Sequence, residues 1–96
     1  MTSHAGDFNF TVNPEAAASF HDDGVVILHT GKGSLFSANK TGARIWRGVA
    51  QQRSFETIVD EISDEYQIAR TTARMHTLDF LTALERQALV QREVAS

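Results

Sequence analysis

The sequence predicts an α+β domain in which a three-stranded antiparallel sheet is followed by three helices. Short runs of β-branched and aliphatic residues, separated by turn residues, fill residues 17–38. Apolar residues at helical spacing fill residues 40–88. The 96 residues should form one domain with its own core, because a chain of this length buries about 60–70% of the surface it exposes when unfolded.

The composition excludes several classes of protein. The chain has no cysteine, which rules out disulfides, thiolate chemistry and zinc sites built on cysteine. No apolar run approaches the ~20 residues that cross a bilayer, and the N-terminus has no signal-peptide pattern, so a cytoplasmic protein without a membrane partner is expected. The net charge of −3 disfavours a nucleic-acid partner, because neutralisation of phosphates drives that kind of binding.

Residues 1–14 are predicted to form an N-terminal arm that is partly flexible. Phe8, Phe10 and Val12 alternate with polar residues, a pattern of period two. It indicates either a strand or an extended arm that lays three apolar side chains on the body of the domain. Pro14 ends the pattern, because it restricts the residue before it and lacks an amide donor.

The three strands are expected as a consecutive meander at residues 17–21, 24–30 and 33–38. Two aspartates and a glycine favour a hairpin turn before the second strand. The sequence Thr-Gly-Lys-Gly at residues 30–33 has two glycines that can adopt the positive φ of another tight turn. Its position between two strands indicates a hairpin and not a phosphate loop, which would lead into a helix.

The three helices are expected at residues 40–51, 55–66 and 70–88. Asn39 and Ser54 are suited to cap the first two, since their side chains can accept from free amides of the first turn. The second helix has an apolar stripe and an opposite acidic face, and the acidic face is interpreted as solvated and not as a metal site.

The third helix has one clear core face. At about 100° per residue, five side chains fall within one arc: Ala73, Thr77, Phe80, Leu81 and Leu84. Met75 and Leu78 fall nearly opposite, with Thr71 and Thr82 beside them. Two interpretations stay open. Single exposed hydrophobes are common on protein surfaces, but a second apolar stripe with an adaptable methionine could also line a groove for a partner.

The last strand of the meander is expected to lie at an open edge of the sheet. Lys32 is the only charged residue near this edge. Proteins normally place more charges or prolines on an edge strand, because these prevent pairing with another chain. An extended peptide could add there as a further strand. The alternative is that the segment 8–12, or a second copy of the chain in a homodimer, covers the edge.

The chain resembles the PqqD family of peptide chaperones, the leader-peptide recognition elements of ribosomally made, modified peptides. The resemblance lies in VVILHTGKGSLFSANKTGARIW at residues 25–46, in a second helix that ends in DEY, and in DFLTALERQALV at residues 79–90. Residues 39–46 are its most specific part and match the family pattern Asn-x-Thr/Val-Gly-x-x-Ile-Trp. It covers residues 15–91, which are predicted to form the peptide-binding domain, and leaves residues 92–96 as a C-terminal tail.

The resemblance implies a winged helix-turn-helix arrangement in which a leader peptide binds as an extra strand on the third strand, against the third helix. Carried over by position, the implied contacts on the strand are Gly33, Ser34, Leu35, Phe36, Ser37 and Ala38. Those on the helix are Thr71, Arg74, Met75, Leu78 and Thr82. The chain departs from the family at Ala38, where leucine is usual, and at Ala88, where glycine is common.

The resemblance further implies a non-enzymatic protein that presents a precursor peptide to a modifying enzyme or leader protease. Lasso-peptide maturation is the favoured setting, and pyrroloquinoline quinone (PQQ) synthesis or a radical-enzyme peptide system would be variants. The alternative is a winged-helix DNA-binding protein, which should present several basic residues to one groove. No cofactor, metal or catalytic group is expected, because the four histidines are scattered and no serine has a nucleophile-elbow context.

Overall fold

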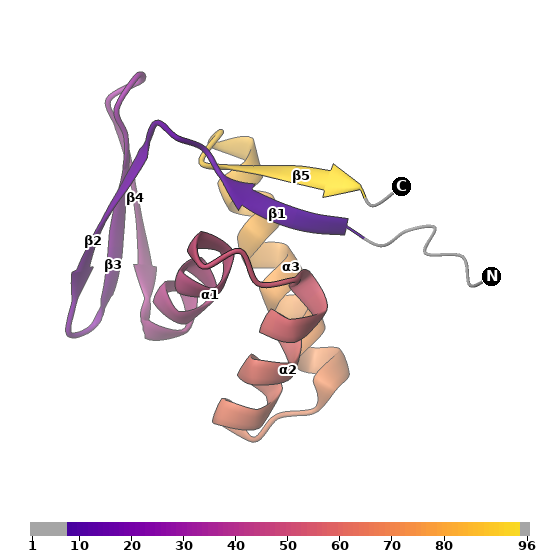
Figure 1. Cartoon of the computed structure of the whole chain (residues 1–96). Coiled ribbons are helices and arrows are strands. Elements are labelled where there is room, and N and C mark those ends of the chain that lie inside the picture. The colour runs from indigo at the N-terminus through magenta and orange to yellow at the C-terminus, as the bar shows by residue number, and fades with distance from the viewer. Residues whose placement is uncertain (1–7, 95–96) are drawn as a thin grey trace.

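The structure is a computed structural model that describes residues 8–94. It has an α+β fold in which three helices follow antiparallel strands (Figure 1). This confirms the predicted class, and a second, two-stranded sheet is added to it. In chain order the elements are β1 (Phe8–Val12), β2 (Ala16–His21), β3 (Gly24–His29), β4 (Ser34–Asn39), α1 (Lys40–Ala50), α2 (Phe55–Tyr66), α3 (Arg70–Arg86) and β5 (Val90–Val94).

The larger sheet is the predicted meander, with strand order β2-β3-β4. Val25 pairs with Phe20 on one side and with Ala38 on the other, so β3 is the central strand. Val25, Ile27 and His29 are buried on the face of the sheet that packs against the helices. The remaining β3 side chains lie on the outer face, as the alternation of a strand requires.

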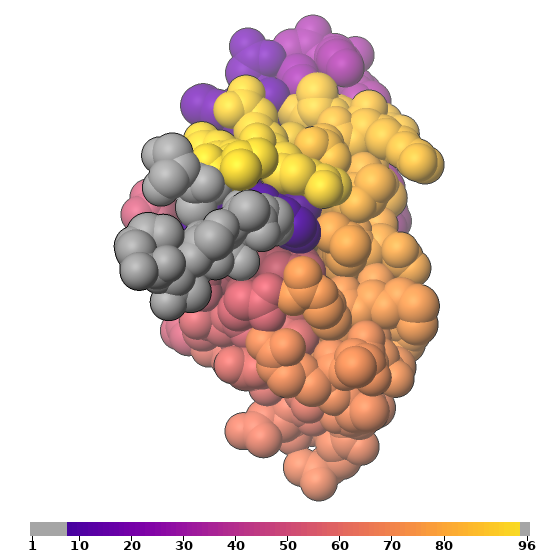
Figure 2. Space-filling model, turned by 90° about the vertical axis from the view of Figure 1, so that its right-hand side faces the viewer, coloured from indigo at the N-terminus to yellow at the C-terminus, as the bar shows by residue number. Residues whose placement is uncertain are grey.

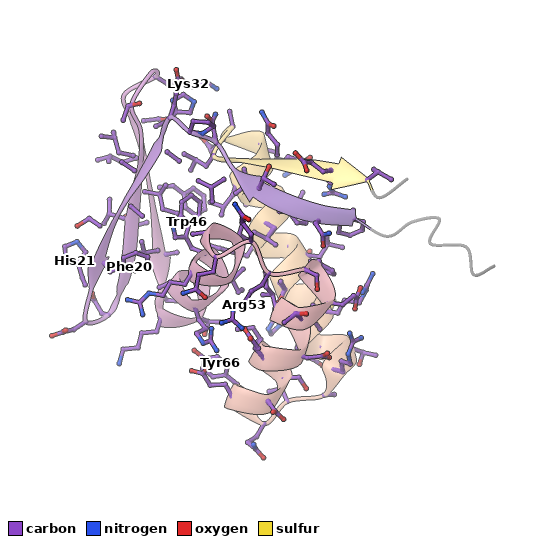
Figure 3. The ribbon with its side chains drawn as sticks, in the orientation of Figure 1. Phe20, His21, Lys32, Trp46, Arg53 and Tyr66 are labelled. Atoms are coloured by element: carbon purple, nitrogen blue, oxygen red, sulfur yellow. The ribbon has the colours of Figure 1, made fainter. Side chains whose placement is uncertain are left out.

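The first two helices, α1 and α2, begin where the capping residues predict. The side chain of Asn39 accepts a hydrogen bond from the amide of Gly42 at 3.0 Å, and that of Ser54 accepts from the amide of Thr57 at 3.1 Å. Figure 1 shows α1 between the three-stranded sheet and the pair formed by α2 and α3. Trp46 points from α1 toward the sheet and is only 3% exposed (Figure 3).

The second sheet joins the two ends of the described chain. Strands β1 and β5 are antiparallel, with Phe10 opposite Arg92 and Val12 opposite Val90. The ring of Phe10 is buried, and its centroid lies 6.1 Å from that of Phe55 at the start of α2. Figure 2, seen from the side of these strands, shows β5 above the length of α3.

This sheet corrects one expectation and decides one open alternative. A C-terminal tail is expected at residues 92–96, yet residues 90–94 form a strand because β1 supplies its hydrogen-bonding partner. The segment 8–12 was an alternative cover for the open edge of the larger sheet. It is a strand, but it pairs with β5, and within residues 8–94 no strand other than β3 pairs with β4.

Replacing Trp46 by alanine should destabilise the domain without touching any exposed surface. The change removes a large side chain that is almost wholly buried, which typically lowers the free energy of unfolding by about 3–5 kcal/mol. Urea denaturation followed by circular dichroism measures the loss. Tyr66→Ala is the matched control, because Tyr66 is 38% exposed and its loss should cost less than about 1 kcal/mol. Equal losses would show that Trp46 is not a core anchor.

Replacing Ala88 by glycine should stabilise the domain. Ala88 has a φ of +61°, in the left-handed region that costs an L-residue roughly 1 kcal/mol relative to glycine. The midpoint of thermal unfolding should therefore rise by about 4–8 °C. In Ala50→Gly, at the end of α1 where φ is not positive, it should fall or stay the same. A fall in Ala88→Gly would mean that the strain is absent.

Candidate functional site

Strand β4 presents an open edge. Within residues 8–94 it pairs with β3 alone, so its other side carries unpaired backbone donors and acceptors. None of its six side chains is charged, and Lys32 lies at the tip of the preceding hairpin (Figure 3). Such an edge can accept another extended chain through main-chain hydrogen bonds.

The side chains of β4 divide between two faces. Ser34, Phe36 and Ala38 are half-buried and face the helices, whereas Leu35 and Ser37 lie on the outer face. Leu35 is 68% exposed. A strand added to this edge would alternate in the same way, so every second side chain would turn toward α3.

An aromatic contact joins β4 to α3. The rings of Phe36 and Phe80 meet edge to face with centroids 6.1 Å apart. Gly42 of α1 allows this close approach: a Cβ there would lie 2.7 Å from the Cβ of Ala38 and 2.9 Å from a ring carbon of Phe80. The glycine of the family pattern therefore has a packing reason in this chain.

A shallow groove of about 280 Å³ begins at this contact. It lies where the end of β4, the first turns of α1 and the middle of α3 meet. His76 and Phe80 are its α3 side, and since they are four residues apart they lie one above the other on the helix. The groove is lined by Asn39, Thr41, Gly42, Ile45, His76 and Phe80.

The comparisons with known proteins agree with this geometry. The family model described as coenzyme PQQ synthesis protein D (PqqD) matches residues 24–90. The chain belongs to the PqqD family. The match contains β3, β4 and all three helices, and so includes the open edge and the groove.

Two solved structures resemble the PqqD chain over most of its length. TbiB1 in complex with the TbiA(beta) leader peptide is 33% identical, with a TM-score of 0.80 over 84% of this chain and 94% of the other. Lasso peptide synthetase B1 complexed with the leader peptide has a TM-score of 0.78 and 24% identity, over 86% of this chain and 98% of the other. The second likeness shows the fold alone. No curated protein matches the chain.

The predicted strand residues of this PqqD chain are all at the open edge. Residues 34–38 lie in β4, and Gly33 ends the preceding turn with a φ of +73°. Gly33 has open space where a side chain would begin. The expected edge and its location are therefore present in the structure, while the peptide contacts themselves stay a prediction.

The predicted helix residues are not gathered beside β4. Arg74 donates to Glu56 of α2 and lies 5.0 Å above the ring of Phe55. Thr82 accepts a hydrogen bond from Arg92 of β5 at 3.3 Å. Both side chains thus face α2 and β5, on the far side of α3 from the Phe36–Phe80 contact.

The other three predicted helix residues are less engaged. Leu78 is half-buried and packs against the core, Thr71 is exposed, and Met75 is 56% exposed. At about 100° per residue, Met75 points about 140° away from Phe80 around the helix axis. None of the residues of the predicted apolar stripe lines the groove.

The sequence interpretation missed His76 and Phe80. Phe80 was assigned to the core face, and it does lie at the border of that face, half-buried between the core and the groove. His76 gave no signal, because it is a polar residue that belongs to no apolar stripe of the helix. Thr72, Phe80 and Ala83 fall within about 40° of His76 on the helix wheel, so apart from Phe80 this side of α3 is small or polar.

The arginines at the start of α3 already have partners. Arg70 donates to Glu56 and, at 2.6 Å, to Asp60, and Arg74 donates to Glu56 as well. Hydrogen bonds from Arg70 and Arg74 lower the pKa of the Glu56 carboxyl from its usual value. These guanidinium groups are neutralised, which weakens the case for a basic recognition helix.

Among residues 8–94, no group of three histidine or carboxylate side chains is placed to hold a metal ion. In the same part of the chain, no helix is long and apolar enough to cross a membrane.

Replacing Gly42 by alanine should damage both stability and the groove. The new methyl group would force Ala38 or Phe80 to move, and overpacking of this kind costs about 1–3 kcal/mol. Thermal unfolding measures the loss, and the environment of Phe80 can be followed by its ring proton resonances. Lys40→Ala, in the same helix but exposed, should change stability by less than about 0.5 kcal/mol. An unchanged Gly42→Ala variant would contradict the tight junction.

Proposed function

We propose that this chain binds the leader segment of a ribosomally made precursor peptide as an added strand along β4 and presents it to a modifying enzyme or leader protease. The observation that carries the proposal is the unpaired, uncharged edge of β4 directly beside an open groove on α3. Membership of the PqqD family supports it.

Lasso-peptide maturation is the setting that we favour. TbiB1 and lasso peptide synthetase B1, both solved with leader peptides, cover most of this chain. PQQ synthesis and radical-enzyme peptide systems would use the same binding role. In each case the protein itself would act without catalysis.

Backbone pairing would provide affinity, and the groove would provide selectivity. Hydrogen bonds from residues 33–38 to the leader do not depend on its sequence. Near the Asn39 end of β4, a leader side chain on the inner face would turn toward His76 and Phe80, where an apolar or aromatic group could pack on the exposed part of the Phe80 ring. Leader side chains on the other face would lie beside Leu35.

The helix contacts of the proposal differ from those expected by family position. His76 and Phe80 become the central contacts, because they line the groove beside β4. Thr71, Met75 and Leu78 remain candidates only where the leader runs past the groove. Arg74 and Thr82 would have to give up existing partners to reach it.

The proposed mechanism is tethering. A bound leader holds the attached core peptide near the active site of the second protein, which raises its effective concentration there. No new chemistry is required of this chain. A homodimer along the β4 edge would compete with the leader for the same backbone groups.

The alternative role, a winged-helix DNA-binding protein, is less well supported. Two arginines of α3 are paired with carboxylates, and the chain has a net charge of −3. A winged helix-turn-helix arrangement remains a proposal about the fold, and it does not imply a nucleic-acid partner.

A matched pair of charge substitutions on α3 tests the proposed site. His76→Glu should weaken binding of a fluorescein-labelled cognate leader at least about tenfold, because a carboxylate would be desolvated in the groove. Met75→Glu should change the dissociation constant by less than about twofold, because Met75 points away from the groove. Fluorescence anisotropy gives both values.

Both residues are exposed, so the two variants should keep the thermal stability of the parent protein. A larger effect of Met75→Glu would restore the apolar stripe inferred from the sequence. Absence of leader binding in the parent protein would overturn the proposed function.

A further inference from the structure

The three-stranded sheet has a second open edge, on β2. Within residues 8–94 this strand pairs only with β3, at the side opposite β4. Residues 16–20 are uncharged, and all of the strand except Ala16 is exposed. An unguarded edge of this kind can pair with an extended segment from another chain.

A cleft of about 210 Å³ lies against the C-terminal end of β2, at Phe20 and His21. It is formed by β2, α1 and the end of α2, and it is separate from the groove beside β4. Figure 3 shows Phe20 and His21 at the end of β2, with Tyr66 at the end of α2. The side chains that matter here are Phe20, Lys40, Arg44, Arg47, Glu65 and Tyr66.

Aromatic surface is exposed at both ends of the cleft. Phe20 is 40% exposed and Tyr66 is 38% exposed. The guanidinium carbon of Arg47 lies 4.3 Å above the centre of the Phe20 ring, which holds the cation in place. A stacked guanidinium keeps N–H groups free at its edge, so it can still bind a carboxylate.

The lining of this cleft is cationic although the chain is acidic. Lys40, Arg44 and Arg47 project from one face of α1, at spacings of four and three residues. Among residues 8–94, Glu65 is the only carboxylate that lines the cleft, and it accepts a hydrogen bond from Arg44 at 2.7 Å. Lys40 and Arg47 therefore give the cleft lining an excess of positive charge, while Asp22 and Asp23 lie in the exposed turn next to it.

We propose that the edge of β2 and this cleft bind an acidic, extended segment of the enzyme that acts on the bound precursor. The segment would pair with β2 through its backbone, and its carboxylates would meet Arg47 and Lys40. Only the identity of the partner rests on the proposed function. Because β2 and β4 are opposite edges of one sheet, leader and enzyme could be bound at the same time.

A peptide titration tests the site directly. The probe is a synthetic peptide of alternating valine and glutamate with one tyrosine, added to ¹⁵N-labelled full-length protein. Amide shifts should saturate at β2, Arg47 and Tyr66 with a dissociation constant below about 1 mM. The same peptide with lysine for glutamate should bind at least about tenfold more weakly, and so should the acidic peptide to Arg47→Glu.

Three results of the titration would overturn the inference. They are an absence of saturable shifts, equal binding of the acidic and basic peptides, and shifts confined to β4. Shifts at β2 that depend on protein concentration without peptide would assign the edge to a second copy of this chain, and would overturn it as well.

A cleavage assay tests the occupant. Arg47→Glu should slow removal of the leader by its processing enzyme at least about tenfold at limiting enzyme. Its affinity for labelled leader should change less than about twofold, because the two sites are separate. Normal cleavage by Arg47→Glu would overturn the inference about the enzyme. Absence of leader binding in the parent protein would instead count against the proposed function. The peptide titration would still test whether β2 and the cleft bind an acidic segment.

Discussion

The site depends on the tight junction of β4, α1 and α3 at Gly42. The Asn39 cap turns the chain from β4 into α1 within one residue, so the edge strand and the helix cannot separate. Absence of a side chain at Gly42 then lets Phe80 reach Phe36 beneath the strand. These contacts fix the distance between the open edge and α3, which is what a chain bound between them would have to fit.

The second sheet has an indirect role at this site. The backbone of segment 8–12 is hydrogen-bonded to β5, and the rings of Phe8 and Phe10 pack on Phe55. Arg92 reinforces the arrangement, since it lies over Phe8 and Phe10 and donates to Glu85 of α3 at 3.0 Å. The N-terminal strand is therefore held against β5, α1 and α2, and no strand within residues 8–94 covers the outer edge of β4.

Local signals in the sequence predict most of this fold. The two hairpin turns, the Asn39 and Ser54 caps and the periodicity of α2 are each contained within a few residues, and each agrees with the structure. Strand β5 could not be predicted in that way. Its partner β1 lies some 80 residues earlier, and its own residues are mostly polar.

The helix side of the candidate site shows a different limit. Periodicity separates the buried face of α3 from the rest, but it cannot say which neighbour each remaining face meets. Here α2 takes the face with Arg74 and β5 takes the face with Thr82. The face toward β4 holds Phe80 and His76. An apolar stripe was therefore a poor guide to a groove whose α3 side is partly polar.

Two open edges on one small sheet also raise the question of selectivity. Backbone groups on β2 and β4 are chemically the same, so hydrogen bonding alone cannot direct different chains to them. The surroundings differ: β4 borders an uncharged groove beside Phe80, whereas β2 borders a cleft with Lys40 and Arg47. An acidic segment would leave its carboxylates unpaired at β4 and would find cations at β2. Discrimination between the edges therefore has to come from the helices that flank them.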